Sequence, residues 1–155
     1  MMKTLLILNG PNLNLLGTRE PGVYGAQTLA EVGQSCAAAC AAQGWACDFR
    51  QSNHEGVLLD WIQEAGAEQA AGRVVGVIFN AGAYTHSSIA LADAVKGAAL
   101  RLIELHISNV HAREAFRQHS YLSPVAAGVL FGFGTAGYVL AVAAMAELLR
   151  SQGQT

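Results

Sequence analysis

Residues 4–25 read TLLILNGPNLNLLGTREPGVYG, and this stretch decides the fold. The apolar run at 4–8 has the length and composition of a buried strand. The segment from Asn9 to Gly25 mixes Asn, Gly and Pro with Leu, so it can neither continue the strand nor form a regular helix. A loop of this length is usually an active-site lid or a disordered segment. Its Leu, Val and Tyr side chains argue against disorder. We therefore interpret the segment as a strand-to-helix lid over a site.

The composition fits one domain with few surface charges. Residues 1–155 are enough for one sizeable core, and we expect a single catalytic domain. The net charge of −2 gives no electrostatic footprint for nucleic acid. Only 13% of residues are charged, against about 25% in typical soluble domains. This favours apolar surface buried between subunits of a homo-oligomer. The alternative is a general enrichment in Ala.

The cysteines and the N-terminus favour a reduced, cytoplasmic protein. Cys36, Cys40 and Cys47 are odd in number and lack the spacing of a zinc site, and buried thiols are the simplest explanation. The apolar run before Asn9 is too short for the apolar region of a signal peptide. We therefore expect a cytoplasmic location.

Apolar and helical segments alternate along the rest of the chain. The further predicted strands cover residues 45–51, 73–79, 100–107 and 125–131. Helices are predicted from capping boxes at Thr28–Glu31 and Ser52–Glu55, from Thr85 or Ser87 to near Gly97, over 112–118 and over 135–150. Five strands alternating with five helices predict an α/β fold, with a five-stranded parallel sheet and helices on both faces.

The predicted sheet brings polar residues from distant parts of the chain to one edge. Asn9, Asn80 and His106 all stand at the carboxyl ends of predicted strands. Ligands of open parallel sheets bind outside the carboxyl ends of the strands. The sequence therefore predicts a binding site at this edge.

Residues 122–146 carry no charge and are long enough to span a bilayer. Glycines interrupt this run, however, and a strand followed by a buried helix gives the same apolar total, which is the interpretation we favour. Gly132, Gly134 and Gly137 also match a dinucleotide-binding fingerprint, which needs a further strand with an acidic residue about 20 positions on. No room for that strand remains before Thr155, so we expect these glycines to allow close packing of strand and helix.

Glu104 and His106 share one face of a predicted strand, because side chains alternate along a strand. A carboxylate near the end of a parallel strand needs a partner, and His106 is the natural one. Glu104 would fix the tautomer of the ring and favour the imidazolium, which makes His106 a candidate proton donor. The alternative is a purely structural Glu–His pair.

Tyr24 in the lid is a candidate base. An ordinary tyrosine has a pKa near 10, too high for a base at neutral pH, and a cation such as Arg19 in the same loop would lower it. The alternative is a tyrosine that anchors the loop through its ring.

Arg113 and Arg117 are one turn apart on the predicted short helix and could reach the mouth of the same site. Ser108 precedes that helix, whose N-terminal amides could hold a carboxylate.

His86 and Asp93 stand on one face of the predicted third helix, about 10 Å apart along its axis, so both could hardly touch one small substrate within a subunit. No set of His, Cys and carboxylate residues has the spacing of a metal site. Lys3 and Lys96 do not stand at a strand's carboxyl end, so no amine is available for a Schiff base. We expect neither a metal nor a cofactor.

Four segments resemble those of type II 3-dehydroquinate dehydratases. They are NGPNLNLLGTREPGVYG from Asn9, NAGAYTHSS from Asn80, ELHISNVHAREAFRQHSYLSP from Glu104 and GFGTAGY from Gly132. The resemblance implies a flavodoxin-like fold and trimers assembled into a dodecamer. From the net charge and from the glycines within residues 122–146, we expect no nucleic-acid partner and no membrane partner. It also implies cofactor-free anti elimination of water from 3-dehydroquinate through an enolate, which gives 3-dehydroshikimate in the shikimate pathway.

The resemblance further implies catalytic roles for matching residues. Tyr24 resembles the family's base, which takes a proton from C2 of the substrate, and Arg19 resembles the cation that keeps it ionised. Asn12 resembles the holder of a water that stabilises the enolate. His106, paired with Glu104, resembles the acid that protonates the departing C1 hydroxyl.

Substrate contacts are implied in the same way. Asn80 and the backbone of Ile107 and Ser108 resemble the family's carboxylate site, with Arg113 near the mouth. His86 and Arg117 resemble its hydroxyl contacts. Asp93 resembles a residue that a neighbouring subunit contributes.

Two other functions are compatible with the same pattern. One is a flavodoxin-like module that binds a flavin or nucleotide without catalysis. The other is an apolar assembly protein that uses residues 122–146. The sequence leaves open whether an enzyme of this kind serves aromatic biosynthesis or quinate breakdown.

Overall fold

The computed structural model describes residues 1–18, 20, 22 and 25–153. The predictions for Arg19 and Tyr24 therefore lie outside the described residues.

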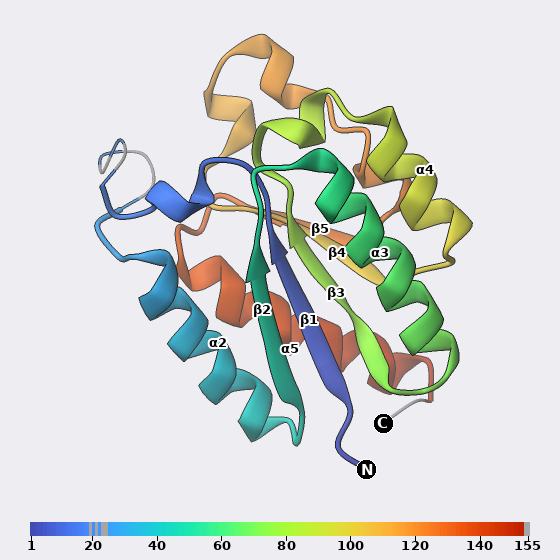
Figure 1. The fold of residues 1–155 in the computed structure, drawn as a ribbon. Helices are drawn as coiled ribbons and strands as arrows, with labels where there is room; N and C mark the ends of the chain where they lie inside the picture. Colours follow the sequence, from blue (N-terminus) through green and yellow to red (C-terminus); the bar gives the residue numbers. More distant parts are fainter. Residues whose placement is uncertain (19, 21, 23–24, 154–155) are drawn as a thin grey trace.

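The described residues contain a five-stranded sheet with the order β2-β1-β3-β4-β5, and each neighbouring pair is parallel (Figure 1). This is the flavodoxin-like strand order. The strands are β1 Thr4–Asn9, β2 Ala46–Gln51, β3 Val74–Asn80, β4 Leu102–His106 and β5 Gly128–Phe131. The predicted α/β fold with a five-stranded parallel sheet is confirmed.

Four long helices cover the two faces of the sheet. They are α2 Leu29–Ala42, α3 Glu55–Ala70, α4 Ile89–Gly97 and α5 Ala136–Ser151. Helices α2 and α5 lie together on one face, and α3 and α4 lie together on the other (Figure 1). A buried parallel sheet of this kind needs both faces covered, because its central strands are apolar on both sides.

Strand β1 shows how the sequence divides the core between these faces. Leu5 and Ile7 are fully buried in the cluster formed with α2 and α5. Leu6 and Leu8 are buried in the cluster formed with α3 and α4. The alternation follows from the two-residue period of a strand. An uninterrupted apolar run is thus what a strand with a helix layer on each side requires.

The start of α2 agrees with the predicted cap. The Thr28 hydroxyl accepts a hydrogen bond from the Glu31 backbone N–H at 3.2 Å. The predicted start at Ser52–Glu55 is wrong in detail, because the helix begins only at Glu55 and its N-cap is His54. The Ser52 hydroxyl instead accepts from the His54 N–H at 3.0 Å and so closes the turn that precedes the helix.

The predicted start of α4 at Thr85 or Ser87 is also wrong. Residues Gly82–His86 form a 3-10 segment, and Ser88 caps α4 by accepting from the Leu91 N–H at 3.0 Å. The Tyr84 carbonyl accepts from the N–H groups of both Ser87 and Ser88, which ends the 3-10 segment before the α-helix can begin. His86 and Asp93 therefore do not share one helix.

The predicted helix over 112–118 is absent as a single element. Two 3-10 turns, Val110–Ala112 and Ala115–Gln118, take its place, and Arg113 between them is extended, with φ −113° and ψ −162°. A segment this short gains little from helix propagation, and Phe116 in it stays 60% exposed. Arg113 and Arg117 are therefore brought together by a loop.

The uncharged run at 122–146 is shared between short elements, as the favoured interpretation predicted. It contains a 3-10 turn Ser123–Val125, strand β5, which starts later than predicted, and the first part of α5. Among the described helices, none has the length and apolarity needed to cross a membrane. A Cβ at Gly137 would lie 3.1 Å from a Leu105 methyl, so this glycine permits the predicted close packing of α5 on the sheet.

Gly10 gives a test of the close approach between the ends of β1 and β3. A Cβ at this position would lie 2.5 Å from the Ala81 carbonyl oxygen, a backbone atom that cannot move aside cheaply. We expect Gly10→Ala to lower the free energy of unfolding by about 2 kcal/mol, as overpacking does. Urea unfolding measures this change. Gly56→Ala is the matched control, because nothing lies within 4 Å of its Cβ and Ala favours the helix. Equal stabilities of the two variants would contradict the close approach.

Candidate active site

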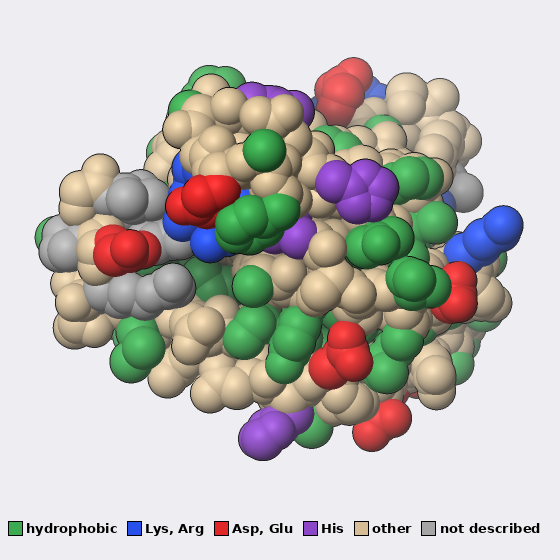
Figure 2. Space-filling model, turned by 90° about the horizontal axis from the view of Figure 1, so that it is seen from above, with side chains coloured by type: hydrophobic (Ala, Val, Ile, Leu, Met, Phe, Trp, Pro, Cys, Tyr) green, Lys and Arg blue, Asp and Glu red, His purple; other side chains and the backbone are tan. Residues whose placement is uncertain are grey.

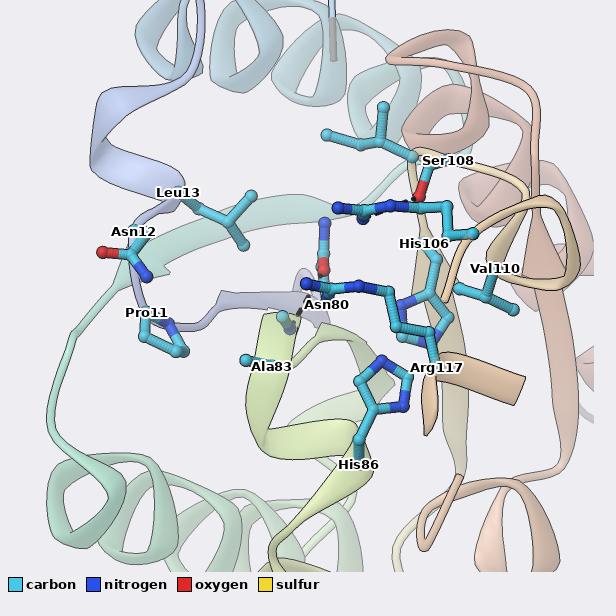
Figure 3. A pocket seen from close by; sticks show the side chains of 13 residues that line it. Pro11, Asn12, Leu13, Asn80, Ala83, His86, His106, Ser108, Val110 and Arg117 are labelled. Carbon is cyan, nitrogen blue, oxygen red and sulfur yellow. Dashed lines mark hydrogen bonds between the residues drawn. The ribbon is translucent and has the colours of Figure 1, made fainter. Parts of the chain in front are cut away.

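A pocket opens at the carboxyl ends of β1, β3 and β4, where the strand order reverses (Figure 3). Ligands of open α/β sheets bind at such a switch point. Figure 2 looks onto this edge of the sheet and shows arginine and histidine side chains close together. The residues predicted for the site that line this pocket are Asn12, Asn80, His86, His106, Ile107, Ser108, Arg113 and Arg117.

On the β1 side, the pocket is bordered by the first turn of the loop that follows β1. Asn12 has a left-handed backbone, with φ 70°, a conformation that asparagine tolerates better than most residues. Its N–H donates to the side-chain oxygen of Asn53 at 3.0 Å. Gln51 donates to the same oxygen at 3.1 Å. The turn is therefore held in place by Asn53, which follows β2 and is itself held by Gln51 at the end of that strand.

On the β4 side lies the predicted pair of Glu104 and His106. Both are buried, with exposed fractions of 1% and 6%, and His106 Nε2 lies 2.5 Å from Glu104 Oε2. A carboxylate only accepts hydrogen bonds, so Nε2 carries a proton and donates it to this bond. The other ring nitrogen, Nδ1, is then the one available to a ligand. Such an arrangement fits a group that exchanges protons with a ligand through Nδ1.

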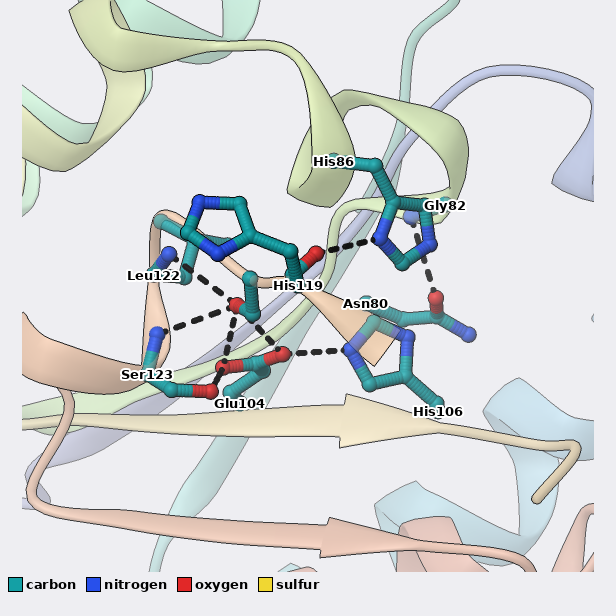
Figure 4. Close-up of polar contacts among 9 residues, drawn as sticks. Asn80, Gly82, His86, Glu104, His106, His119, Leu122 and Ser123 are labelled. Carbon is teal, nitrogen blue, oxygen red and sulfur yellow. Dashed lines mark hydrogen bonds and ion pairs between the residues drawn. The ribbon is translucent and has the colours of Figure 1, made fainter. Parts of the chain in front are cut away.

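Two serine hydroxyls complete the surroundings of the Glu104 carboxylate (Figure 4). Ser123 donates to Oε1 at 2.6 Å, and Ser120 lies 3.0 and 2.9 Å from the two oxygens. The Ser120 oxygen also accepts from the backbone N–H groups of Leu122 and Ser123, so its own hydrogen points to the carboxylate. Burial raises the pKa of Glu104, but the hydrogen bonds from His106 and the serines outweigh it and leave that pKa lowered.

Sequence reasoning did not single out Ser120 and Ser123. They follow the second 3-10 turn of the loop, far along the chain from Glu104. No periodic pattern connects a loop serine to a strand residue. The only signal was that both lie in the long segment that carries the family resemblance.

His86 is held through the other ring nitrogen than His106. Its Nδ1 lies 2.8 Å from the His119 carbonyl oxygen, which can only accept, so Nδ1 carries a proton (Figure 4). The rings of His86 and His106 are stacked, with centroids 6.2 Å apart. Burial, together with the charges of His106 and Arg117, lowers the pKa of His86. The neutral His86 ring therefore offers Nε2 as an acceptor, beside Nδ1 of His106.

Arg113 and Arg117 give the mouth of the pocket a positive charge. Arg113 Nη1 donates to the Ser108 hydroxyl at 3.3 Å, and Arg117 pairs with Glu114. None of the described residues that line the pocket is acidic. Two guanidinium groups at the mouth of the pocket suit an anionic ligand, in particular a carboxylate.

Asn80 lies at the base of the pocket, where β3 ends, and is 3% exposed. Its side-chain oxygen accepts from the Gly82 N–H at 3.2 Å. Ile107 and Ser108 follow β4 opposite it. The helix N-terminus predicted beyond Ser108 is wrong, because only the three-residue turn Val110–Ala112 follows, and the Asn109 side chain already accepts from the His111 N–H.

Asp93 lies away from this pocket. It is exposed on α4 and borders a separate groove between α3 and α4, together with Gln63 and Ala90. His86 lines the pocket and Asp93 lines the separate groove, so the two residues do not face the same cavity, although the single helix predicted for them is wrong. In the described part of the chain, no three His, Cys, Asp or Glu side chains come together as a set of metal ligands.

The fold and the pocket together define a flavodoxin-like α/β protein with a cationic acid–base pocket at the switch point of its sheet. Residues 3–146 match the family described as dehydroquinase class II. The chain belongs to this family, which confirms the resemblance seen in the sequence.

Similar proteins agree with this assignment over nearly the whole chain. The chain is 64% identical over 147 residues to the 3-dehydroquinate dehydratase of Acidovorax sp. (strain JS42), covering 95% of this chain and 99% of the relative. It is 57% identical to 3-dehydroquinate dehydratase 2 of Pseudomonas aeruginosa, covering 95% and 96%. The crystal structure of the type II dehydroquinase from Butyrivibrio crossotus is similar with a TM-score of 0.88 at 38% identity, covering 94% and 98%.

The surroundings of Glu104 predict a specific loss of stability in acid. Its pKa is lowered in the folded state, so its contribution is complete above the unfolded value of about 4.3 and disappears as the pH falls through the folded value. We expect the free energy of unfolding of the wild type to fall more steeply than that of Glu104→Gln between about pH 5 and pH 3.

Urea unfolding at several pH values checks this prediction. Glu64→Gln is the control, because the Glu64 side chain is 60% exposed. Its curve should run parallel to that of the wild type. Parallel curves for the wild type and Glu104→Gln would show instead that the carboxylate of Glu104 is no more stabilised in the folded than in the unfolded state.

Proposed function

We propose that this chain catalyses the reversible anti elimination of water from 3-dehydroquinate to give 3-dehydroshikimate, a step of the shikimate pathway. The observation that carries the proposal is the family match over residues 3–146, joined to a cationic pocket that contains a buried Glu–His pair. Relatives at 57–65% identity bear the name 3-dehydroquinate dehydratase. Because the chain belongs to this family, we favour the dehydratase over the two alternative functions, a flavin- or nucleotide-binding module and an apolar assembly protein.

The reaction needs a base that removes the C2 proton next to the ketone. Tyr24 takes this role, and Arg19 keeps it ionised by its positive charge, as the family resemblance implies. Asn12 holds a water that stabilises the negative oxygen of the enolate. A base of tuned pKa and a stabiliser of the developing charge are the two contributions that such an enolate step requires.

His106 then protonates the hydroxyl that leaves C1. The proton removed by Tyr24 and the hydroxyl protonated by His106 together account for the loss of one water. The hydrogen bond from His106 Nε2 to Glu104 supports this role, because it fixes the ring and leaves Nδ1 facing the substrate. Glu104 acts through His106 and does not line the pocket.

The remaining lining residues bind and orient the substrate. Asn80 and the backbone of Ile107 and Ser108 hold its carboxylate, and Arg113 adds positive charge at the mouth. His86 and Arg117 contact its hydroxyl groups. An acceptor at His86 Nε2 supports this role for His86, because a substrate hydroxyl can donate to it. No step of this mechanism requires a cofactor or a metal.

A complete site further requires Asp93 from a neighbouring subunit, within trimers that assemble into a dodecamer. Two observations support an oligomer: the low proportion of charged residues, and the position of Asp93 on a groove separate from the pocket. The enzyme acts in the cytoplasm, where its pathway operates, as one catalytic domain over residues 1–155.

Turnover of 3-dehydroquinate tests the function directly, because the product contains a conjugated double bond that absorbs ultraviolet light. Tyr24→Phe should lower kcat by at least about 10²-fold, the scale of a lost general base, while the protein stays folded. Tyr121→Phe is the control and should retain wild-type turnover. Near-wild-type turnover in Tyr24→Phe would remove Tyr24 from the mechanism. A wild-type protein without turnover would refute the function itself.

Co-refolding of two inactive variants tests the shared site. Tyr24→Phe and Asp93→Ala are mixed in equal amounts, unfolded and refolded together. In a cyclic trimer assembled at random, about a quarter of the sites combine an intact Tyr24 with an intact Asp93 from the adjacent subunit. Activity should return towards that fraction of the wild type. No activity beyond the sum of the two variants would show that Asp93 acts within its own chain or not at all.

A further inference from the structure

A buried tyrosine of α5 contacts Asn80, at the base of the pocket, from the side of the core. Tyr138 is fully buried, and its hydroxyl lies 2.6 Å from Asn9 Oδ1 and 2.9 Å from Asn80 Nδ2. Asn9 ends β1 and Asn80 ends β3, and the two are paired in the register of the sheet. One hydroxyl thus joins the two central strands at the edge where the ligand site lies.

The hydrogen bonds of this group run in one direction, and the backbone fixes that direction at both ends. Asn9 Nδ2 donates to the Arg50 carbonyl at 3.0 Å, so the Asn9 oxygen faces Tyr138 and accepts from it. The Tyr138 oxygen is then free to accept from Asn80 Nδ2. At the other end, Asn80 Oδ1 accepts from the Gly82 N–H at 3.2 Å. A carbonyl cannot donate and an N–H cannot accept, so neither amide can turn over without breaking two bonds.

The direction of these hydrogen bonds determines which polar atom of Asn80 is available to a ligand. Its side-chain nitrogen carries two hydrogens, of which Tyr138 takes one. The side-chain oxygen of Asn80 accepts from the Gly82 N–H (Figure 4). Asn80 therefore presents a hydrogen-bond donor to the pocket that it lines. Burial raises the pKa of Tyr138 above its ordinary value, so the hydroxyl keeps its proton and both its bonds over the working range of pH.

We propose that Tyr138 is a positioning residue for substrate binding: its hydroxyl holds the Asn80 amide as a donor towards the substrate carboxylate. The inference rests on the proposed function only for the identity of that carboxylate. Tyr138 does not line the pocket and acts through Asn80 alone. Its role is distinct from that of Glu104, which supports the proton donor on β4.

Tyr138→Phe removes the hydroxyl and keeps the ring, which packs against Phe49 with centroids 6.2 Å apart. We expect KM for 3-dehydroquinate to rise about tenfold or more, the scale of one lost hydrogen bond to a charged group, while kcat changes less than about threefold. Val142→Ala is the control for packing, because Val142 is also buried on α5 and takes no part in the chain of hydrogen bonds. The proposal is wrong if Val142→Ala unfolds at a midpoint similar to that of Tyr138→Phe and shows the same rise in KM as Tyr138→Phe.

A double-mutant cycle asks whether the effect passes through Asn80. Asn80→Ala alone should raise KM at least as much as Tyr138→Phe. The double variant should resemble Asn80→Ala alone, because residues that act through one another are not additive. Additive effects would overturn the proposal and leave the dehydratase function intact.

Hydrogen exchange of the Asn80 side-chain amide provides a readout that does not depend on turnover. In the wild type the NMR signals of this amide should exchange slowly, since both of its polar atoms are hydrogen-bonded. In Tyr138→Phe they should exchange at least about tenfold faster, and in Val142→Ala they should not. Unchanged exchange in Tyr138→Phe would overturn the inference. A wild-type protein that fails to dehydrate 3-dehydroquinate but shows this pattern would overturn only the proposed function.

Discussion

The parallel pairing of β1 with β3 is the constraint on which the rest of the structure depends. These strands are adjacent in the sheet, yet the chain continues from them into different segments: into the loop that contains Leu13–Leu15 after β1 and into the 3-10 segment after β3. The pocket opens between these segments, and Asn80, which is paired with Asn9, lies at its base. Gly10 allows the two backbones to come this close. A side chain at this point would separate the strands that the site requires to be together.

A second requirement is the charge buried at the end of β4. An isolated carboxylate in an apolar layer would be costly, and the cost falls only when every oxygen lone pair finds a donor. The loop after β4 supplies those donors through Ser120 and Ser123. That loop also carries Arg117 to the mouth of the pocket and the His119 carbonyl to His86. The same irregular segment thus stabilises the Glu104 carboxylate, brings a guanidinium group to the pocket and orients the His86 ring.

The sequence predicted the strands better than the helix starts, because the two depend on different forces. The apolar runs that form β1 and β3 are decided by burial, which a single segment reveals. The start of α4 depends on whether the Tyr84 carbonyl or a serine hydroxyl takes the local N–H groups, and several residues were equivalent candidates. Likewise, eight predicted site residues meet at one pocket because strand ends converge. The serine partners of Glu104 and the tyrosine partner of Asn80 come from distant segments that only the folded chain brings near.

The two stacked imidazoles make the pocket sensitive to the handedness of its ligand. His86 is held through Nδ1 by a carbonyl and His106 through Nε2 by a carboxylate, so each ring presents one fixed nitrogen to the pocket, Nε2 from His86 and Nδ1 from His106. A ring-shaped polyol that entered as the mirror image, or with two of its oxygen substituents exchanged, would leave one or both of these nitrogens without a hydrogen-bond partner. Unpaired polar groups of this kind discriminate more sharply than a misfit of apolar surface does. Two contacts outside the pocket, the His119 carbonyl with His86 and the Glu104 carboxylate with His106, therefore restrict which stereochemistry of ligand the site accepts.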